Sequence, residues 1–244
     1  MSDLVLSLFP GIGLLDMAFE AEGFCVVRGP DKLWGGDVKR FHPPADTFGG
    51  VIGGPPCKCH SSLVHLCRAM GYTMAENLIP EFERVVSEAA PSWFLMENVP
   101  LAPLPSVPGY AVNAVLLNNR QCGGVQNRVR RFSFGTRDGL ALTVATVQEP
   151  AEWAPAVIAS SGGDWLKARN GSGGGGVIQK RRPLEENIRL QGLPADFLAD
   201  APFTDEGKRE VVGNGVPLPL GRAIARAVRE ATAGAEGPSG PGAA

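Results

Sequence analysis

The chain has 244 residues, of which 44% are hydrophobic and 20% charged, a composition typical of one α/β domain with a small appendage. Its 23 basic and 25 acidic residues give a net charge of −2, so a nucleic-acid partner would need a local basic cleft. The first residues lack the basic segment of a signal peptide, no stretch is apolar for long enough to cross a bilayer, and the five cysteines are an odd number. We therefore expect a cytoplasmic protein with free thiols and no membrane partner.

Apolar runs alternate with helical patterns along most of the chain. We expect strands at 4–9, 25–28, 50–53, 93–97 and 131–135, helices at 14–22, 76–89, 184–191 and 220–231, and either element at 110–117. Strands that alternate with helices predict an α/β fold with a doubly wound, mostly parallel sheet. Ligands of such folds gather at the carboxyl ends of the strands.

The composition changes after Gly139. Residues 140–180 are rich in alanine, glycine and serine, and residues 233–244 are glycine, proline and alanine for the most part. We expect a core domain formed by 1–139 and 181–232, a small insert at 140–180, and a disordered tail at 233–244.

The first motif is LFPGIG, where a strand runs through Gly11 and Gly13 into a helix. This arrangement brings the backbone close to a ligand beside a helix N-terminus, although a tight turn in any Rossmann-like domain would look the same. The third glycine of the dinucleotide fingerprint is absent. An adenosine-bearing ligand without a pyrophosphate is therefore favoured over NAD.

The second motif, GGPPCKCHS, places Cys57 after two prolines at the end of a strand, where a nucleophile would face the ligand edge of the sheet. Positive charge from Lys58 and His60 would favour the thiolate. A zinc cluster is the alternative, because three cysteines and two histidines lie within eleven residues: Cys57, Cys59, His60, His65 and Cys67. Their spacing lacks the usual two-residue gap, so we expect no metal.

Two further runs carry polar groups on predicted strands. In FLMENVP, Glu97 ends an apolar strand, where a carboxyl could hydrogen-bond a base edge or simply form a turn salt bridge. In QNRVRRF, Gln126, Arg128 and Arg130 alternate and would share one face of an extended chain. They could bind phosphate and a flipped base, or could be a solvated strand face.

Taken together, these runs resemble the DNA cytosine-C5 methyltransferase family, in the family's own order. LFPGIG is similar to its cofactor loop, GGPPC to its nucleophile motif, ENV to its glutamate motif and QNRVR to its glutamine-arginine-arginine strand. RRPLEENIRLQGLPADF and VVGNGVPLPLGRAIA resemble its last two motifs. The resemblance implies a Rossmann-like, class I S-adenosylmethionine-dependent fold. It also implies a DNA partner whose cytosine is flipped out of the duplex.

The resemblance also implies roles for individual residues. The Cys57 thiolate would add to C6 of the cytosine, Glu97 would bind N3 and the exocyclic amine, and Arg130 with Arg128 would hold O2. Lys58, Ser61 and Gln126 would contact DNA, and Ser61–Met74 would form the loop that closes over it. S-adenosylmethionine would be held by the following residues: Phe9 against the adenine, Gly11, Gly13, Asp31 at the ribose, Asp37 at the adenine amine, Pro55, Asn214 and Val216.

Four departures from the family pattern have consequences. Ser7 replaces an acid of the first motif, only five residues separate Asp31 from Asp37 where the family has a helix, and Lys58-Cys59-His60 adds charge after the nucleophile. The interval between QNRVR and RRPL, where the family has its recognition domain, is short and glycine-rich. We expect a short or loose target, with contacts from Trp165, Lys167 and Arg169.

The resemblance is to a compact, orphan or phage-like enzyme of the restriction-modification type. We expect a monomer in the cytoplasm of a bacterium or a phage-infected cell, associated with the nucleoid. The alternatives are an RNA (tRNA) cytosine-C5 methyltransferase, a non-catalytic nucleic-acid-binding member of the fold, and a zinc-binding nucleic-acid module.

Overall fold

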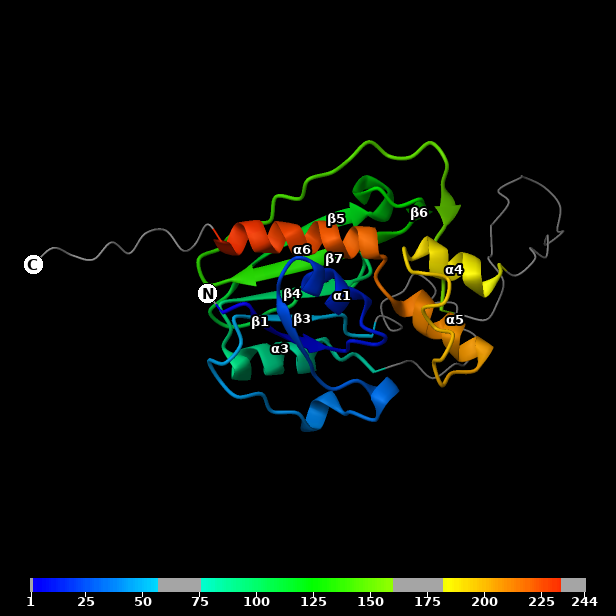
Figure 1. Ribbon diagram of the computed structural model, residues 1–244. Coiled ribbons are helices and arrows are strands. Elements are labelled where there is room, and N and C mark those ends of the chain that lie inside the picture. Colours follow the sequence, from blue (N-terminus) through cyan, green and yellow to red (C-terminus); the bar gives the residue numbers. More distant parts are fainter. Residues whose placement is uncertain (1, 57–75, 160–181, 234–244) are drawn as a thin grey trace, which may run out of the picture.

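A six-stranded sheet with helices on both faces forms the body of the protein (Figure 1). The computed structural model describes residues 2–56, 76–159 and 182–233. The strands are β1 Leu4–Leu8, β2 Cys25–Arg28, β3 Gly50–Gly53, β4 Trp93–Asn98, β5 Ala111–Asn118, β6 Gln126–Asn127, β7 Val129–Thr136 and β8 Ala154–Pro155. The helices are α1 Leu14–Ala21, α3 Ile79–Ala89, α4 Leu184–Leu190, α5 Asp205–Asn214 and α6 Leu218–Ala233, with the 3₁₀ turns η1 Lys32–Trp34, η2 Val38–Arg40 and η3 Asn119–Cys122.

The strand order is β2-β1-β3-β4-β7-β5, and only β7 runs against the others. Because β2 and β3 lie on opposite sides of β1, the chain reverses its direction of winding at β1. The carboxyl end of β1 is therefore the switch point at which open α/β sheets bind ligands. This topology confirms the doubly wound, mostly parallel sheet predicted from the sequence.

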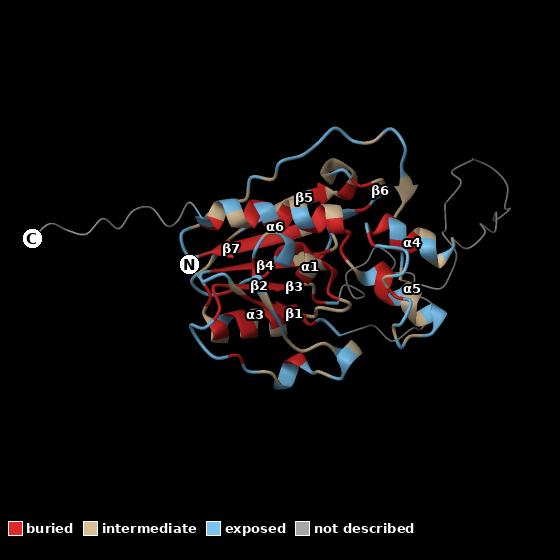
Figure 2. Cartoon of the chain, in the orientation of Figure 1, coloured by how far each residue is buried: buried red, intermediate tan, exposed pale blue. Residues whose placement is uncertain are grey.

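The sheet is buried on both faces, as its continuous apolar strands require (Figure 2). One face packs against α3, through residues such as Phe82, Val86 and Met96. The other packs against α1 and α6, through Phe19 and Ile224 among others. The two core layers fix the position of the strand ends.

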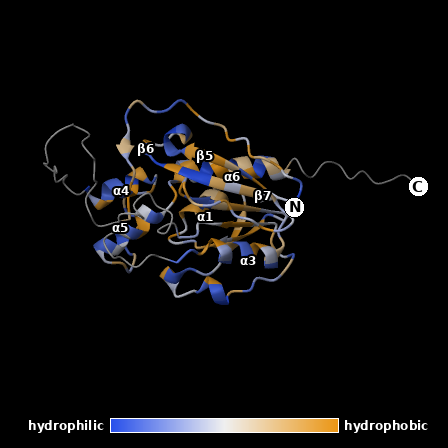
Figure 3. Ribbon diagram, turned by 180° about the vertical axis from the view of Figure 1, so that it is seen from behind, coloured by the Kyte–Doolittle hydropathy of each residue, from blue (hydrophilic) through white to orange (hydrophobic). Residues whose placement is uncertain are grey.

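Helices α1 and α6 close the second face side by side, although they come from opposite ends of the chain (Figure 1). The methyl group of Ala18 lies so near Gly221 that a Cβ added there would come within 2.9 Å of it. At the far end, the guanidinium of Arg229 lies 3.7 Å from the centre of the Phe24 ring. In Figure 3 the helices carry hydrophilic residues outward and hydrophobic ones toward the sheet.

A smaller unit lies beyond the carboxyl ends of the parallel strands, formed by α4, α5 and the short parallel pair β6–β8 (Figure 1). It has its own apolar cluster, which includes Val157, Ile188 and Val212. Leu14, the first residue of α1, belongs to the same cluster and joins the unit to the main sheet.

Most predicted elements are confirmed, with three differences. The segment 110–117 is a strand, α3 begins at Ile79 rather than at residue 76, and α5 was not predicted. The later start of α3 has a local cause, because the Asn77 side chain accepts a hydrogen bond from the Ile79 amide at the turn before the helix. No helix in the described ranges is long and apolar enough to cross a membrane.

The described part of the expected insert, residues 140–159, packs against the core rather than standing apart from it. Leu140, Leu142 and Val144 contact the apolar layer under α6, and the Val147 amide donates to the Gln121 carbonyl at 2.8 Å. Val157 is buried between β6 and the unit containing α4 and α5. The tail at 234–244 lies outside the described residues.

Candidate functional site

A cavity of about 590 Å³ opens at the carboxyl ends of β1, β2 and β3. This volume suits a nucleotide-sized ligand. Its walls come from segments that are far apart in the sequence, around residues 7–16, 30–38, 53–56 and 203–216. Six of the eight predicted cofactor residues line it: Phe9, Gly11, Asp31, Pro55, Asn214 and Val216.

Gly13 and Asp37 do not line the cavity. Gly13 precedes α1 with a φ of 81°, and the Arg28 guanidinium packs so closely on it that a Cβ would come within 2.5 Å of Nη2. Asp37 accepts a hydrogen bond from the Lys39 amide at 3.1 Å and caps η2. Its neighbours Gly36 and Val38 do line the cavity, so the Asp37 segment contributes backbone rather than this carboxylate.

The loop after β1 adopts a left-handed backbone that brings it close to the cavity. Phe9 has a φ of 57°, which is costly for a residue other than glycine, and Gly11 has a φ of 56°. Asp31 holds this loop, because its Oδ2 accepts the Gly11 amide at 2.8 Å while its Oδ1 accepts the Leu33 amide at 2.7 Å. Each carboxylate oxygen keeps a second lone pair, so Asp31 can still accept from a ligand hydroxyl.

Trp34 fastens the same loop from the other side. Its indole Nε1 donates to the Gly11 carbonyl at 2.7 Å, and its ring lies 5.7 Å from that of Phe203, which lines the cavity. Neither Trp34 nor Phe203 was predicted as a site residue. The signal in the sequence was weak, since a tryptophan in a glycine-rich loop has no motif of its own.

A buried acid also lines the cavity, and sequence reasoning missed it. Asp16 on α1 has no exposed surface, and the Ser7 hydroxyl donates to its Oδ1 at 2.5 Å. Its Oδ2 lies 3.0 Å from Arg28 Nε. Burial raises the pKa of the Asp16 carboxyl, while Ser7 and Arg28 oppose that shift. A carboxylate among the apolar residues of a helix was the available signal.

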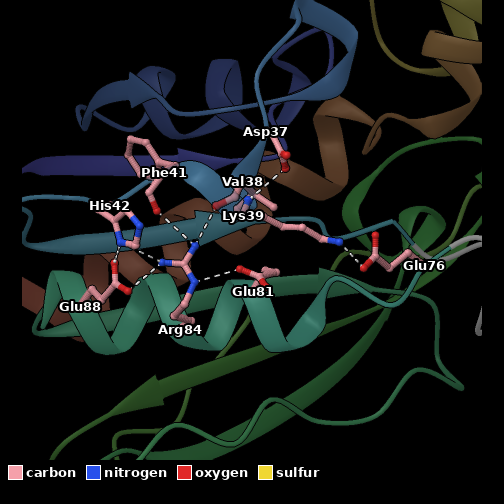
Figure 4. A network of polar contacts seen from close by, with 9 residues as sticks. All are labelled: Asp37, Val38, Lys39, Phe41, His42, Glu76, Glu81, Arg84 and Glu88. Carbon is pink, nitrogen blue, oxygen red and sulfur yellow. Dashed lines mark hydrogen bonds and ion pairs between the residues drawn. The ribbon is translucent and has the colours of Figure 1, made fainter.

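The segment that carries Val38 into the cavity is clamped to α3 by Arg84 (Figure 4). The Arg84 Nη2 donates to the carbonyls of Val38 at 2.8 Å and Phe41 at 3.1 Å. Glu81 and Glu88 hold the same guanidinium, at 2.9 and 2.7 Å. Burial acts to raise the pKa of Glu88, but Arg84 and His42 outweigh it and the pKa is lowered.

A second bond in the same view joins Lys39 of η2 to Glu76, which lines the cavity (Figure 4). Both side chains are about half exposed, so this ion pair adds little to stability. Arg84 is thus the main link between η2 and α3.

Glu97 lies beside the segment that leads to Cys57. Its Oε1 is 2.9 Å from Arg130 Nε, and a Cβ added to Gly54 would come within 3.0 Å of its Oε2. The neighbouring Asn98 amide donates to the Pro55 carbonyl at 3.2 Å. Burial raises the pKa of the Glu97 carboxyl, while Arg130 and Arg128 oppose the shift. The carboxyl therefore holds a proton more readily than an ordinary glutamate.

The family model for C-5 cytosine-specific DNA methylases matches residues 36–102, which include Pro55 and Glu97. The type II methyltransferase M.HgiDI of Herpetosiphon aurantiacus is 28% identical over 173 residues, covering 58% of this chain and 55% of the relative. The type II methyltransferase M.NgoPII of Neisseria gonorrhoeae is 28% identical over 163 residues, covering 59% and 43%. Over residues 36–102 the chain is thus similar to C-5 cytosine-specific DNA methylases.

The chain spans about half the length of the curated relatives it matches. Solved structures agree on the fold. The Entamoeba histolytica methyltransferase EhMeth superposes with a TM-score of 0.65 at 11% identity, over 94% of this chain and 98% of that one. A putative DNA modification methyltransferase of an Escherichia coli prophage gives 0.61 at 18% identity, over 94% and 99%. The α/β fold of S-adenosylmethionine-dependent methyltransferases is thereby confirmed.

Two of the expected site residues, Gln126 and Arg128, hold the fold together through buried hydrogen bonds. Gln126 is fully buried, its amide donating to the Leu190 carbonyl at 3.0 Å and accepting from the Val157 amide at 2.9 Å. Arg128 is also buried, and its guanidinium donates to the carbonyls of Val157, Gly213 and Gly215. The expected contacts of Gln126 with DNA and of Arg128 with the base are not supported, because both side chains are directed into the protein.

Several expectations fall outside the described residues. They are the nucleophile Cys57, the DNA contacts Lys58 and Ser61, the loop at 61–74, and Trp165, Lys167 and Arg169. The zinc alternative falls there too, since all five of its ligands lie at 57–67. Among the residues that the structure does describe, no group of three or more histidines, cysteines or acids could hold a metal ion.

Proposed function

We propose that this chain is a DNA cytosine-C5 methyltransferase that uses S-adenosylmethionine. One observation carries the proposal: the cavity lined by six expected cofactor residues reaches Gly54 and Pro55, and Glu97 with its partner Arg130 lies directly beside Gly54. A cofactor-sized space and a base-binding carboxyl thus meet on either side of the strand end that leads to Cys57. The matching family model, that of C-5 cytosine-specific DNA methylases, favours DNA as the substrate.

The residues present fit S-adenosylmethionine. A Cβ on Gly11 would meet no atom within 4 Å, so the loop backbone is open to a ligand in the cavity. Phe9 would stack on the adenine, Asp31 would accept from the ribose hydroxyls, and Asn214 and Val216 would hold the methionine end. When bound, the cofactor supplies an electrophilic methyl group on its sulfonium.

The chain's own groups would make C5 of cytosine nucleophilic. The Cys57 thiolate bonds to C6 of the flipped base, and Glu97 donates its proton to N3 as electron density moves onto the ring. The raised pKa of Glu97, which follows from its burial, favours this donation, because the carboxyl holds its proton to a higher pH than an ordinary glutamate does. Arg130 orients Glu97 and reaches O2. After C5 has accepted the methyl group, a solvent base takes the C5 proton, the Cys57 thiolate leaves C6, and N3 returns its proton to Glu97, which restores the neutral aromatic ring.

The other described cysteines are poor candidates for this step. Cys122 is half-buried, and burial raises the pKa of its thiol to about 11. Cys25 is exposed on β2, the edge strand of the sheet. We further propose a short DNA target and a monomeric enzyme in a bacterial cytoplasm, with the nucleoid as its site of action.

A trapping experiment tests the proposal. The purified chain is incubated with S-adenosylmethionine and duplex DNA containing 5-fluorocytosine, whose C5 carries no removable proton, so that a covalent adduct persists on a denaturing gel. We expect an adduct with the wild type and with the control Cys25→Ala, and none with Cys57→Ala. Methylated bases in ordinary DNA are then mapped by sequencing, with structured RNA as the competing substrate. Methylation by Cys57→Ala, or of RNA alone, would overturn the proposal.

A further inference from the structure

Arg131 on β7 has no role in the mechanism above, although it follows Arg130 directly. Because β7 runs against β4, its first residues lie beside the carboxyl end of β4, and Arg131 is the partner of Asn98 across the two strands. The Asn98 amide in turn holds the Pro55 carbonyl, two residues before Cys57 in the sequence. Arg131 therefore lies at the ligand-binding edge of the sheet, near the segment that leads to Cys57.

The side chains of Arg130 and Arg131 point to opposite faces of the sheet, because successive residues of a strand alternate. Phe132 and Phe134 belong to the core layer beneath α1 and α6. Arg130 shares their face, where it meets Glu97. Arg131 is therefore on the other face, the one on which α3 packs (Figure 1).

The Arg131 guanidinium has no partner in the part of the chain that the structure describes. Its Nε and Nη2 are buried and make no hydrogen bond. Its neighbours across the strands, Asn98 and Leu116, are uncharged, and the Ser133 hydroxyl on the same face makes no hydrogen bond either. Burial lowers the pKa of the guanidinium, and no acid of the described residues opposes that shift. A cation placed in this way costs free energy unless a ligand supplies an acceptor.

Arg128 shows the opposite condition three positions earlier in the sequence. Its guanidinium is buried, but it donates to the carbonyls of Val157, Gly213 and Gly215. Arg131, in contrast, remains partly exposed, and its neighbour Leu116 is 56% exposed. An anion can therefore reach the Arg131 guanidinium from solvent.

Under the proposed function, on which this inference rests, the anion that passes this edge is the backbone of DNA. A base held between Glu97 and Cys57 stays attached to its sugar, so the phosphates next to the flipped nucleotide must run past the strand ends. The net charge of −2 gives the chain no general attraction for DNA, so a local cation has to supply it. The partly desolvated position of Arg131 strengthens a charge-assisted hydrogen bond to a phosphate oxygen.

We propose that Arg131 binds a backbone phosphate of the DNA beside the flipped cytosine. Two consecutive arginines then serve two parts of the substrate from the two faces of one strand. Arg130 acts at the base together with Glu97, and Arg131 acts at the phosphate. The phosphate also balances a charge that the fold otherwise buries without a partner.

Binding of duplex DNA at several salt concentrations tests the inference. Each phosphate contact adds about 0.9 to the steepness with which log affinity falls against log salt concentration. We expect Arg131→Met to weaken DNA binding about five-fold or more at about 0.1 M salt, and to lower that steepness by about one. Its affinity for S-adenosylhomocysteine should stay within about two-fold of the wild type. Arg131→Lys, which keeps the charge, should keep most of the salt dependence.

Arg137→Met is the matched control. Arg137 is exposed and follows Thr136, which pairs with Trp93 at the opposite end of β4. This control should leave the salt dependence of DNA binding unchanged. An equally unchanged salt dependence in Arg131→Met would overturn the inference, whereas a wild type that binds no DNA would overturn the proposed function together with it.

Thermal unfolding without DNA separates a DNA contact from a structural role. Because the unpartnered guanidinium is costly to bury, Arg131→Met should raise the Tm of the DNA-free chain by about 2 °C or more. An arginine that supports the fold would lower Tm when it is replaced. A variant that melts below the wild type and keeps its salt dependence would show that Arg131 is structural, and would overturn the inference.

Discussion

Replacement of Arg128 by methionine should lower the stability of the fold. The reason is the loss of buried hydrogen bonds to the backbone and not the loss of a contact with the base. The Arg128 guanidinium donates to the Val157 carbonyl at 2.6 Å and to those of Gly213 and Gly215 at 2.8 and 3.2 Å. Methionine fills a similar volume but has no donor, so the carbonyls of Val157 and Gly213 lose this donor and that of Gly215 keeps Gln191. Gly215 also lies between two residues of the cavity wall, so cofactor affinity should fall as well.

The magnitude follows from the type of bond that is lost. A hydrogen bond from a charged donor contributes about 1.5–3 kcal/mol, and removal of one partner of a buried charged network costs about 3–5 kcal/mol overall. For a chain of this size each kcal/mol lowers Tm by about 2–4 °C, so Arg128→Met should melt about 6–20 °C below the wild type.

Thermal unfolding followed by circular dichroism measures this difference. Arg226→Met is the matched control, because Arg226 is 62% exposed and pairs with Glu22 on the surface. We expect that control to shift Tm by less than about 3 °C. A Tm for Arg128→Met as high as that of the control would refute the reasoning. It would also reopen a catalytic role for Arg128.

Two further substitutions test the site. Burial raises the pKa of the Glu97 carboxyl, so this group binds its proton more tightly in the folded chain than in the unfolded chain. The carboxyl therefore contributes its full stability below the ordinary pKa of a glutamate. That contribution falls as the pH rises through the raised pKa. As the pH rises above the ordinary pKa of a glutamate, the Tm of Glu97→Gln should therefore rise relative to that of the wild type, while its methylation rate falls by about 100-fold or more. A Tm difference independent of pH would contradict this account. Arg84→Met should release the carbonyls of Val38 and Phe41, weakening S-adenosylhomocysteine binding about five-fold in calorimetry and lowering stability by about 1 kcal/mol. Unchanged affinity would mean that the cavity wall at Val38 holds its shape without the clamp.

The central strands were predictable because burial on both faces demands continuous apolar runs, and the fully buried β3 begins and ends at the predicted residues. The edge strand β2 also has its predicted bounds, although it is largely exposed. Helix α5 was missed for the opposite reason. Its sequence, DEGKREVVGN, contains two glycines and buries only Val211, Val212 and Gly213, so no apolar stripe marks it. Its N-terminal signal, Thr204 as the cap, was present but is common in loops.

The alternating spacing of Gln126, Arg128 and Arg130 led to the prediction that their side chains share one face of an extended strand. The spacing alone did not predict where these side chains lie. Strand pairing is interrupted at Arg128, between β6 and β7, and the three side chains have different partners. Arg130 turns to Glu97, while Arg128 turns to carbonyls 29, 85 and 87 positions away. Those acceptors are backbone atoms brought near by folding, and no local pattern in the sequence identifies them.

The pairing of the first helix with the last has a consequence for synthesis. Phe19 on α1 and Val5 on β1 pack against Leu220, Ile224 and Val228 of α6, and Glu22 meets Arg226 across 204 positions. During translation the apolar side of the nascent amino-terminal third therefore stays open to water until the final helix leaves the ribosome. Over that interval the growing polypeptide exposes a surface suited to chaperone capture, and slow or interrupted elongation late in the message would favour aggregation over the folded state.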